Sequence, residues 1–304
     1  MLSYRKGLNR AIFSPDLNRT ENFDFSRNTT YGLGGTAELA YCPHTIWQAK
    51  AVFDALKRCS TPYTVLGCGS NVLVSDFGYG GAVISTKNLR GTIRLSPDRL
   101  LCLAGTRVAE LLAYCRKRNL GGLEYLYGIP ASMGGVAYMN AGVGGDVIAN
   151  NVESVRVYDG KDRVLSAENC NFLYRHSTMR DINALILAII VKVNSSNPAE
   201  IDKRITYYMN RREHLPRGKS CGCVFKNPPN LSAGELIDRA GLKLARVGGA
   251  FVSDKHASFI INDGGTASDV RALIKIVKER VLSAFGISLE EEVVYIGEFY
   301  DTDS

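Results

Sequence analysis

The stretch Gly128-Ile-Pro-Ala-Ser-Met-Gly-Gly-Val-Ala-Tyr-Met-Asn-Ala-Gly142 decides how the rest of this 304-residue chain is interpreted. It is mostly Gly, Ala and Ser and carries no charge, so it is less polar than a linker and less bulky than a core element. Because Gly134 and Gly135 lack Cβ atoms, a ligand could approach the backbone closely. Backbone N–H groups and the Ser132 hydroxyl would then bind an anion directly. The alternative is a tightly packed turn beside a strand.

A second uncharged loop, Val65-Leu-Gly-Cys-Gly-Ser-Asn-Val-Leu-Val-Ser-Asp76, favours the anion-binding interpretation. Gly67 and Gly69 match the start of a dinucleotide fingerprint, but position 72 is not glycine and residues 72–74 continue as a strand. No Gly-Lys-Ser/Thr follows, which excludes a Walker loop. We expect a strand–turn–strand unit that binds phosphate through backbone N–H groups, with a simple hairpin turn as the alternative. Two such loops favour a ligand with an extended diphosphate.

Apolar spacing predicts a mixture of helices and strands along the chain. We expect helices from residue 46 to about 60, from 108 to 118, up to 212, and from about 268 to 285, where Gly286 ends the last one. Strands are expected at 63–66, 72–74, 81–86, 100–104, 152–158, 185–193 and 292–296. The segment 185–193 is apolar enough to be buried on both faces. This mixture places the fold in the α/β or α+β class.

Composition narrows the class of protein. The chain is 45% hydrophobic, has a net charge of +7, and has no apolar run long enough to cross a bilayer. Residues 1–7 lack the apolar core of a secretory signal, so we expect a cytoplasmic protein. The eight cysteines form no Cys-x-x-Cys pair, and we expect no metal site and a reducing compartment. No nucleic-acid motif is present, so phosphorylated small molecules explain the basic charge.

Several further motifs occur in a defined order: residues 28–35, Tyr174-Arg175, 222–228, 246–250, 256–262 and 289–293. Together with the two loops, they resemble the shorter subtype of the UDP-N-acetylenolpyruvoylglucosamine reductase (UDP-N-acetylmuramate dehydrogenase, MurB) family over nearly the whole chain. The resemblance implies an α+β fold: a two-subdomain FAD cradle of the vanillyl-alcohol-oxidase (PCMH) type plus a C-terminal α/β substrate-binding domain. The implied subdomains are 1–86, joined by strand 289–304, and 87–196, with the substrate domain at 197–288.

The resemblance also implies the reaction. NADPH reduces FAD, and reduced FAD passes a hydride to the enolpyruvyl double bond of a UDP-sugar, giving UDP-N-acetylmuramate for peptidoglycan. The residues implied to contact FAD are Gly67, Cys68, Gly69, Ser70, Asn71, Val72, Gly105, Gly128, Ile129, Ala131, Ser132, Gly134, Gly135, Asn140 and Gly142. Ala131 and residues 143–145 depart from the usual family residues.

The implied chemistry needs three groups around the substrate. Hydride addition at C3 puts negative charge on C2 and on the adjoining carboxylate, and this charge must be stabilised before C2 is protonated. Arg175 is suited to grip the carboxylate with two hydrogen bonds. Glu292 is suited to donate a hydrogen bond, provided that its pKa is raised enough to keep it protonated. The family's Leu-x-x-Glu-Val pattern selects Glu292 from three consecutive glutamates.

The third group is a departure from the family. Where Gly-Ser is usual and the serine protonates C2, this chain has Gly222-Cys223. A thiol with an ordinary pKa of about 8.5 is a stronger acid than an alcohol, but its thiolate cannot donate a proton. We therefore expect activity to fall at a lower pH than in a serine enzyme. The alternative is a buried structural cysteine, with water as the acid.

Lys226 and Asn227 are candidates for binding the substrate's UDP diphosphate or uridine, with help from Arg212, and Tyr174 is a further substrate-binding candidate. Val294 departs from members that carry a substrate-contacting arginine there. We expect a UDP-sugar as partner, no nucleic acid, no membrane, and a monomer or a weak dimer. Two other functions stay open: another FAD-dependent oxidoreductase or oxidase on the same cradle, and a non-catalytic basic nucleotide-binding module.

Overall fold

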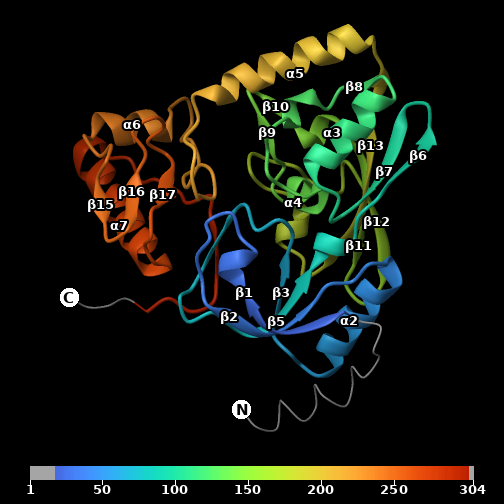
Figure 1. Cartoon of the computed structure of the whole chain (residues 1–304), viewed down its shortest axis with the longest axis horizontal. Coiled ribbons are helices and arrows are strands. Elements are labelled where there is room, and N and C mark those ends of the chain that lie inside the picture. Colours follow the sequence, from blue (N-terminus) through green and yellow to red (C-terminus); the bar gives the residue numbers. More distant parts are fainter. Residues whose placement is uncertain (1–17, 301–304) are drawn as a thin grey trace. The chain divides into compact units, whose positions relative to one another are not determined.

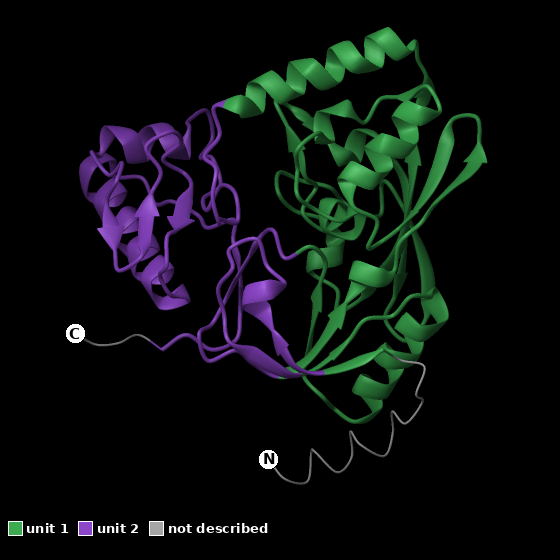
Figure 2. Ribbon diagram, viewed as in Figure 1, with its two compact units in different colours: residues 1–20, 39–68, 81–213 green, residues 21–38, 69–80, 214–304 purple. Residues whose placement is uncertain are grey.

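The computed structural model describes residues 18–300 and divides into two compact units (Figure 2). Of the described residues, unit 1 comprises 18–20, 39–68 and 81–213, and unit 2 comprises 21–38, 69–80 and 214–300. The N-terminal stretch expected to lack a secretory signal falls outside the described residues. The three subdomain boundaries expected from the sequence stay a prediction.

The largest sheet belongs to unit 1 and has the strand order β12-β11-β13-β7-β6 (Figure 1). All its neighbouring strands are antiparallel. Its central strand β13 is buried along most of its length, as its apolar sequence predicted. The strands are β6 (Thr92–Ser96), β7 (Arg99–Leu103), β11 (Val152–Tyr158), β12 (Asp162–Ser166) and β13 (Leu185–Lys192).

A second, four-stranded sheet has the order β1-β2-β5-β3. Its parallel pair β3–β5 aligns Tyr63 with Ala82 and Leu66 with Ser85. Strand β3 leads into the predicted turn and strand β4, which confirms the strand–turn–strand expectation. The strands of this sheet are β1 (Arg19–Asp24), β2 (Thr36–Tyr41), β3 (Tyr63–Leu66) and β5 (Tyr79–Ser85), whereas β4 (Val72–Val74) lies outside it.

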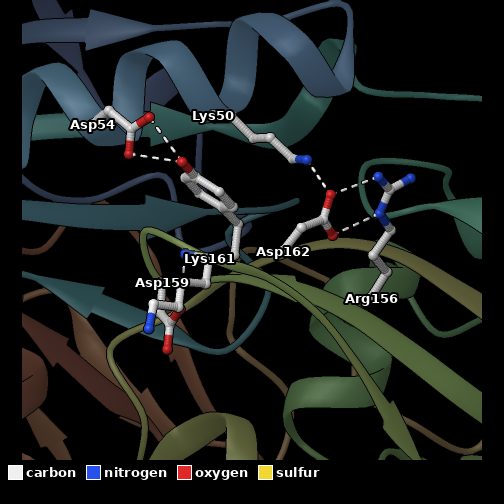
Figure 3. A network of polar contacts seen from close by, with 7 residues as sticks. Lys50, Asp54, Arg156, Asp159, Lys161 and Asp162 are labelled. Carbon is white, nitrogen blue, oxygen red and sulfur yellow. Dashed lines mark hydrogen bonds and ion pairs between the residues drawn. The ribbon is translucent and has the colours of Figure 1, made fainter.

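Helix α2 (Ile46–Arg58) begins at the Thr45 capping box and buries Val52, Phe53 and Leu56, as the apolar spacing predicted. Its exposed face joins a polar network with the β11–β12 hairpin (Figure 3). Asp162 lies between the side chains of Lys50 and Arg156 and is paired with both. The two cationic partners hold the pKa of the Asp162 carboxyl well below its ordinary value.

The remaining helices of unit 1 follow the predicted spacing, with one addition. Helix α3 (Val108–Lys117) and helix α5 (Pro198–Glu213) were expected, whereas the short helix α4 (Met133–Tyr138) was not. The two-residue strands pair as β8 (Leu120–Gly121) with β14 (Asn194–Ser195) and β9 (Gly142–Val143) with β10 (Asp146–Val147). Single 3₁₀ turns occur at Phe25–Arg27 in unit 2 and, in unit 1, at Thr86–Asn88, Glu124–Leu126, Ile148–Asn150 and Thr178–Arg180.

Unit 2 has its own apolar core, formed around helix α7. Helix α7 (Ala267–Phe285) begins at the Thr266 capping box and ends at Gly286, whose φ of 69° is the left-handed conformation expected of a C-terminal glycine. Asp76 accepts hydrogen bonds from the first backbone N–H groups of this helix, Ala267 at 2.8 Å and Ser268 at 2.9 Å. A loop that precedes the helix by 191 residues therefore completes its N-terminus.

Strands β4 and β15–β18 of unit 2 form two small sheets. One is antiparallel, in the order β15-β16-β17, and the other is the parallel pair β18–β4. Strand β18 begins at Val294, two residues later than expected, because Glu292 bonds to Val224 instead of to β4. The elements are β15 (Arg246–Val247), β16 (Ala250–Val252), β17 (Ile260–Asn262), β18 (Val294–Ile296) and helix α6 (Ala233–Arg239).

Candidate functional site

The two Gly-containing loops meet in unit 1. A Cβ built on Gly67 would lie 2.4 Å from the Ser132 Oγ atom, so only glycine allows the loops this approach. A side-chain hydrogen bond also links Cys68 with Ser132, and burial is the main cause of the raised pKa of the Cys68 thiol. The rest of the first loop, residues 69–72, belongs to unit 2. Convergence of two uncharged Gly-containing segments fits a backbone cradle for a diphosphate.

The second loop contains the unexpected helix α4. The Ser132 hydroxyl accepts a hydrogen bond from the Gly135 N–H at 3.4 Å and thereby caps this helix. Gly134 packs against Ala104: its N–H donates to the Ala104 carbonyl at 2.8 Å, and a Cβ would lie 3.0 Å from that oxygen. The small residues of this run therefore have a packing role in helix α4.

Three other residues assigned to FAD have clear structural tasks. A Cβ on Gly105 would lie 1.8 Å from the Thr86 carbonyl, and one on Gly142 would lie 1.9 Å from the Asp146 carbonyl. Asn140 is buried, and its amide donates to the Leu173 carbonyl at 2.9 Å while its Oδ1 accepts from the Ala149 N–H. Asn140 therefore anchors the segment that leads into Tyr174-Arg175. Ile129 and Ala131 bond to each other through the backbone.

Arg175 lies in unit 1 beside the second loop. Its φ of 54° is unusual for a residue with a side chain, and its backbone carbonyl accepts a hydrogen bond from Arg180 at 2.8 Å. Its guanidinium Nη2 lies 3.5 Å from the Gly142 carbonyl, so the charge is held against the loop. The adjacent Tyr174 is 51% exposed, which leaves its ring accessible to a ligand.

Arg212, near the end of helix α5, also lies against the second loop. A Cβ on Gly128 would lie 2.7 Å from the Arg212 Nε atom, so the absent side chain at Gly128 makes room for this guanidinium. Unit 1 therefore brings Arg175 and Arg212 to the two ends of the same Gly-containing run, which gives that run the positive charge that its own sequence lacks.

Cys223 and Glu292 lie together in unit 2. The Glu292 backbone N–H donates to the Val224 carbonyl at 2.7 Å, which places Glu292 beside the residue that follows Cys223. Cys223 itself forms an antiparallel bridge with Phe259 and is half-buried. Backbone hydrogen bonding thus brings the Glu292 segment against the segment that contains Cys223.

Cys221 differs from Cys223 in its environment. Its side chain is buried in the core of unit 2 and is hydrogen-bonded with Tyr31. Burial, with smaller contributions from Cys223 and Glu292, raises the pKa of the Cys221 thiol to about 12. A thiol this weakly acidic is suited to a core position, whereas the half-buried Cys223 is the accessible member of the pair.

The other two consecutive glutamates form ion pairs. Glu290 pairs with Lys226, and Glu291 binds Lys278 at 2.5 Å and the Tyr295 hydroxyl at 2.6 Å. Asn227 accepts a hydrogen bond from the Ala233 N–H at the start of helix α6. Lys226 and Asn227, assigned to the UDP moiety, therefore each have a structural contact in the described part of the chain.

Thr30 and Tyr31 were not singled out from the sequence as site residues, yet they hold the Cys223 segment. The Thr30 hydroxyl donates to the Ser220 carbonyl at 2.7 Å, and the Thr30 N–H donates to the Gly69 carbonyl at 3.0 Å. The Tyr31 hydroxyl donates to the Ile260 carbonyl at 3.1 Å. The only signal in the sequence was their place in the motif at 28–35, since these contacts join residues far apart in the chain.

Between residues 18 and 300, no group of three or more His, Cys, Asp or Glu side chains is arranged to hold a metal ion. Over the same residues, no helix has the length and apolar character needed to span a membrane.

Comparisons with known proteins match both halves of the chain. Residues 37–168 match the model of an FAD binding domain, and residues 213–296 match that of the C-terminal domain of UDP-N-acetylenolpyruvoylglucosamine reductase. The UDP-N-acetylenolpyruvoylglucosamine reductase of Moorella thermoacetica is 40% identical over 91% of this chain and 93% of its own length. That of Clostridium botulinum is 38% identical over 90% of each chain.

A solved structure agrees with these relatives. The crystal structure of UDP-N-acetylenolpyruvylglucosamine reductase from Thermus caldophilus superposes with a TM-score of 0.76 at 35% identity, covering 92% of this chain and 98% of that one.

Proposed function

This chain belongs to the UDP-N-acetylenolpyruvoylglucosamine reductase family, and from that premise we infer how its residues perform the reaction. It is an FAD-dependent oxidoreductase that uses NADPH to reduce UDP-N-acetylenolpyruvoylglucosamine to UDP-N-acetylmuramate for peptidoglycan. The expectations of family, fold class, cofactors and activity are thereby confirmed. The roles of individual residues are our proposal.

The cradle for FAD is assigned to the two loops that meet at Gly67 and Ser132. Their close approach, which a Cβ on Gly67 would prevent, fits a backbone site for the diphosphate. Ser70, Asn71 and Val72 continue the first loop, and Gly128, Ile129, Ala131, Gly134 and Gly135 belong to the second. FAD, when bound, supplies the hydride that it has received from NADPH.

Arg175 is assigned to the substrate carboxylate. A guanidinium is charged at every working pH and offers two parallel N–H donors to a carboxylate. Negative charge that develops on the carboxylate during hydride addition is stabilised by this fixed positive charge. Tyr174 and Arg212 in unit 1, and Lys226 and Asn227 in unit 2, are assigned to the UDP moiety.

Glu292 and Cys223 are assigned to the substrate's C2 side. Protonated Glu292 donates a hydrogen bond to the developing enolate, and the Cys223 thiol transfers its proton to C2. Hydride at C3 and proton at C2 complete the reduction, and the Cys223 thiolate then regains a proton from solvent. The observation that supports this assignment is the 2.7 Å hydrogen bond from the Glu292 N–H to the Val224 carbonyl, which joins the Glu292 segment to the residue that follows Cys223.

The test of the function is an anaerobic cycle followed by flavin absorbance. Purified protein should be yellow, should bleach on addition of NADPH, and should regain its colour on addition of UDP-N-acetylenolpyruvoylglucosamine. Recolouring by oxygen and not by the UDP-sugar, or bleaching of the oxidised flavin by a simple sugar alcohol in place of NADPH, would identify a different oxidoreductase on this cradle. A colourless protein that does not take up FAD would identify a nucleotide-binding module.

We also propose a cytoplasmic location, no nucleic-acid partner, and a monomer or weak dimer. The substrate and NADPH are both phosphorylated cytoplasmic metabolites, and the +7 net charge suits them. Light scattering of the purified protein at several concentrations measures the oligomeric state.

A further inference from the structure

We propose that Asn71 is a positioning residue for Glu292, in addition to any contact that it makes with FAD. This inference rests on the function proposed above, and it adds a second role to the first loop of the FAD cradle. The loop would hold the hydrogen-bond donor of the reaction in place as well as the cofactor. The proposal comes from one set of hydrogen bonds that the cofactor and substrate assignments do not use.

Asn71 forms two hydrogen bonds with the chain around Val293, one to the residue before it and one to the residue after it. Its side-chain amide donates to the Glu292 carbonyl at 3.0 Å, and its own carbonyl accepts the Val294 N–H at 3.0 Å. The parallel pairing of β4 with β18 begins immediately afterwards, with Val72 opposite Val294. The Asn71 side chain therefore extends the ladder by one step, to a residue that the backbone of β4 does not reach.

The Glu292 backbone is then fixed from two directions. Its N–H donates to the Val224 carbonyl at 2.7 Å, next to Cys223, and its carbonyl accepts from Asn71 in the cradle loop. All of these residues lie in unit 2. Because both backbone groups of Glu292 are bonded, the direction in which its side chain leaves the backbone is set by Val224 and Asn71 together.

An amide is required for this task. Substitution of Asn71 by alanine removes the amide donor and leaves the Glu292 carbonyl without that hydrogen bond. Substitution by aspartate places a carboxylate, which can only accept, against the Glu292 carbonyl, which also accepts. A misdirected Glu292 would donate poorly to the developing enolate, whereas reduction of FAD by NADPH does not use Glu292. Loss of the bond should therefore slow flavin reoxidation by substrate more than flavin reduction by NADPH.

The first test compares the two half-reactions of FAD-loaded Asn71→Ala by stopped-flow absorbance. We expect reoxidation of the reduced flavin by substrate to slow by about 10- to 100-fold. Flavin reduction by NADPH should slow at least about fivefold less than reoxidation does, because Glu292 takes no part in it. Asn151→Ala is the matched control, because the Asn151 amide also donates to a backbone carbonyl, that of Lys192 at 3.0 Å, but in unit 1. Equal slowing of both half-reactions in Asn71→Ala would overturn the proposal.

The second test asks whether Asn71 acts through Glu292. In the Glu292→Gln background, adding Asn71→Ala should slow flavin reoxidation by less than about twofold, because coupled residues are not additive. Full additivity would overturn the positioning role. If Glu292→Gln alone reoxidised at the wild-type rate, the assignment of Glu292 under the proposed function would fail instead, so the two failures are distinguishable.

The third test needs no turnover. Hydrogen exchange of the Glu292 and Val294 amides, followed by mass spectrometry of the FAD-free and FAD-loaded protein, should speed up in Asn71→Ala and not in Asn151→Ala. Unchanged exchange at both amides would show that Asn71 does not hold this segment.

Discussion

At the scale of single residues, the paired cysteines show how two identical side chains acquire different chemistry. Cys221 is buried in the core of unit 2 beside Tyr31, whereas Cys223 is half-buried beside Glu292. One intervening glycine with φ of 84° separates them. Position in the fold, and not residue type, therefore decides which thiol is available as an acid.

Alkylation should distinguish the two thiols. Because the pKa of Cys221 is about 12, only about one molecule in ten thousand carries its thiolate at pH 8. Brief treatment of the folded protein with iodoacetamide should leave Cys221 unmodified, as fragmentation of the peptide 220–226 would show. In urea, both cysteines should react. Rapid modification of Cys221 in the folded protein would contradict its assigned burial.

Gly69 is the residue of the first loop that tolerates a side chain least. Its φ is +63°, and a Cβ would lie 2.5 Å from the Asn28 carbonyl oxygen and 2.8 Å from the Thr29 Cα. Gly69→Ala should weaken FAD binding by about tenfold, since left-handed strain costs roughly 1–2 kcal/mol. Titration of the FAD-free protein with FAD, followed by flavin fluorescence, measures the dissociation constant. Gly80→Ala, where a Cβ meets nothing within 4 Å, is the control, and equal affinities in the two variants would contradict the prediction.

At the scale of elements, the sequence predicted those helices and strands whose determining residues lie close together in the chain. The β3–turn–β4 unit and helices α2, α3 and α7 follow from apolar spacing and caps within a few residues. Helix α4 was missed because glycines at 134 and 135 are poor helix formers, and the Ser132 cap was interpreted as an anion contact. The start of β18 was missed because Val224, far away in sequence, takes the Glu292 N–H.

The Asp162 network gives a prediction about pH at this scale. Arg156 and Lys50 lower the pKa of Asp162 in the folded protein. The ionised Asp162 carboxylate therefore stabilises the fold fully above the unfolded-state pKa of about 3.9. This contribution is lost as the pH falls below that value toward the folded-state pKa. Asp162→Asn should reduce the unfolding free energy by about 0.5–1 kcal/mol at pH 7, since the carboxylate is partly exposed.

The difference between Asp162→Asn and wild type should persist to pH 5 and shrink below about pH 4. Urea unfolding at each pH measures this difference in the free energy of unfolding. The control is Glu168→Gln, because Glu168 is an exposed carboxylate in the same unit. A difference that grew as the pH fell would contradict the direction of the pKa shift.

At the scale of the whole molecule, the sequence motifs identified the family, and the structure shows what holds the candidate site. The order of motifs sufficed to identify the family and its FAD binding domain and to propose Arg175, Cys223 and Glu292 as catalytic residues. It did not reveal that Thr30 binds the Ser220 carbonyl or that Asn71 binds the Glu292 carbonyl. Such contacts join residues about 190 and 220 positions apart, so no local pattern encodes them.

The central claim is that the Cys223 thiol supplies the proton at C2. The most direct measurement is the single-turnover rate at which substrate reoxidises NADPH-reduced enzyme, compared among wild type, Cys223→Ser and Cys223→Ala across pH. Cys223→Ala should be slower by about 100-fold or more, as expected when a general acid is removed. Cys223→Ser should remain active and keep its rate to a higher pH than wild type, because a hydroxyl does not ionise where a thiol does. A Cys223→Ala variant that reoxidises at the wild-type rate would contradict the claim.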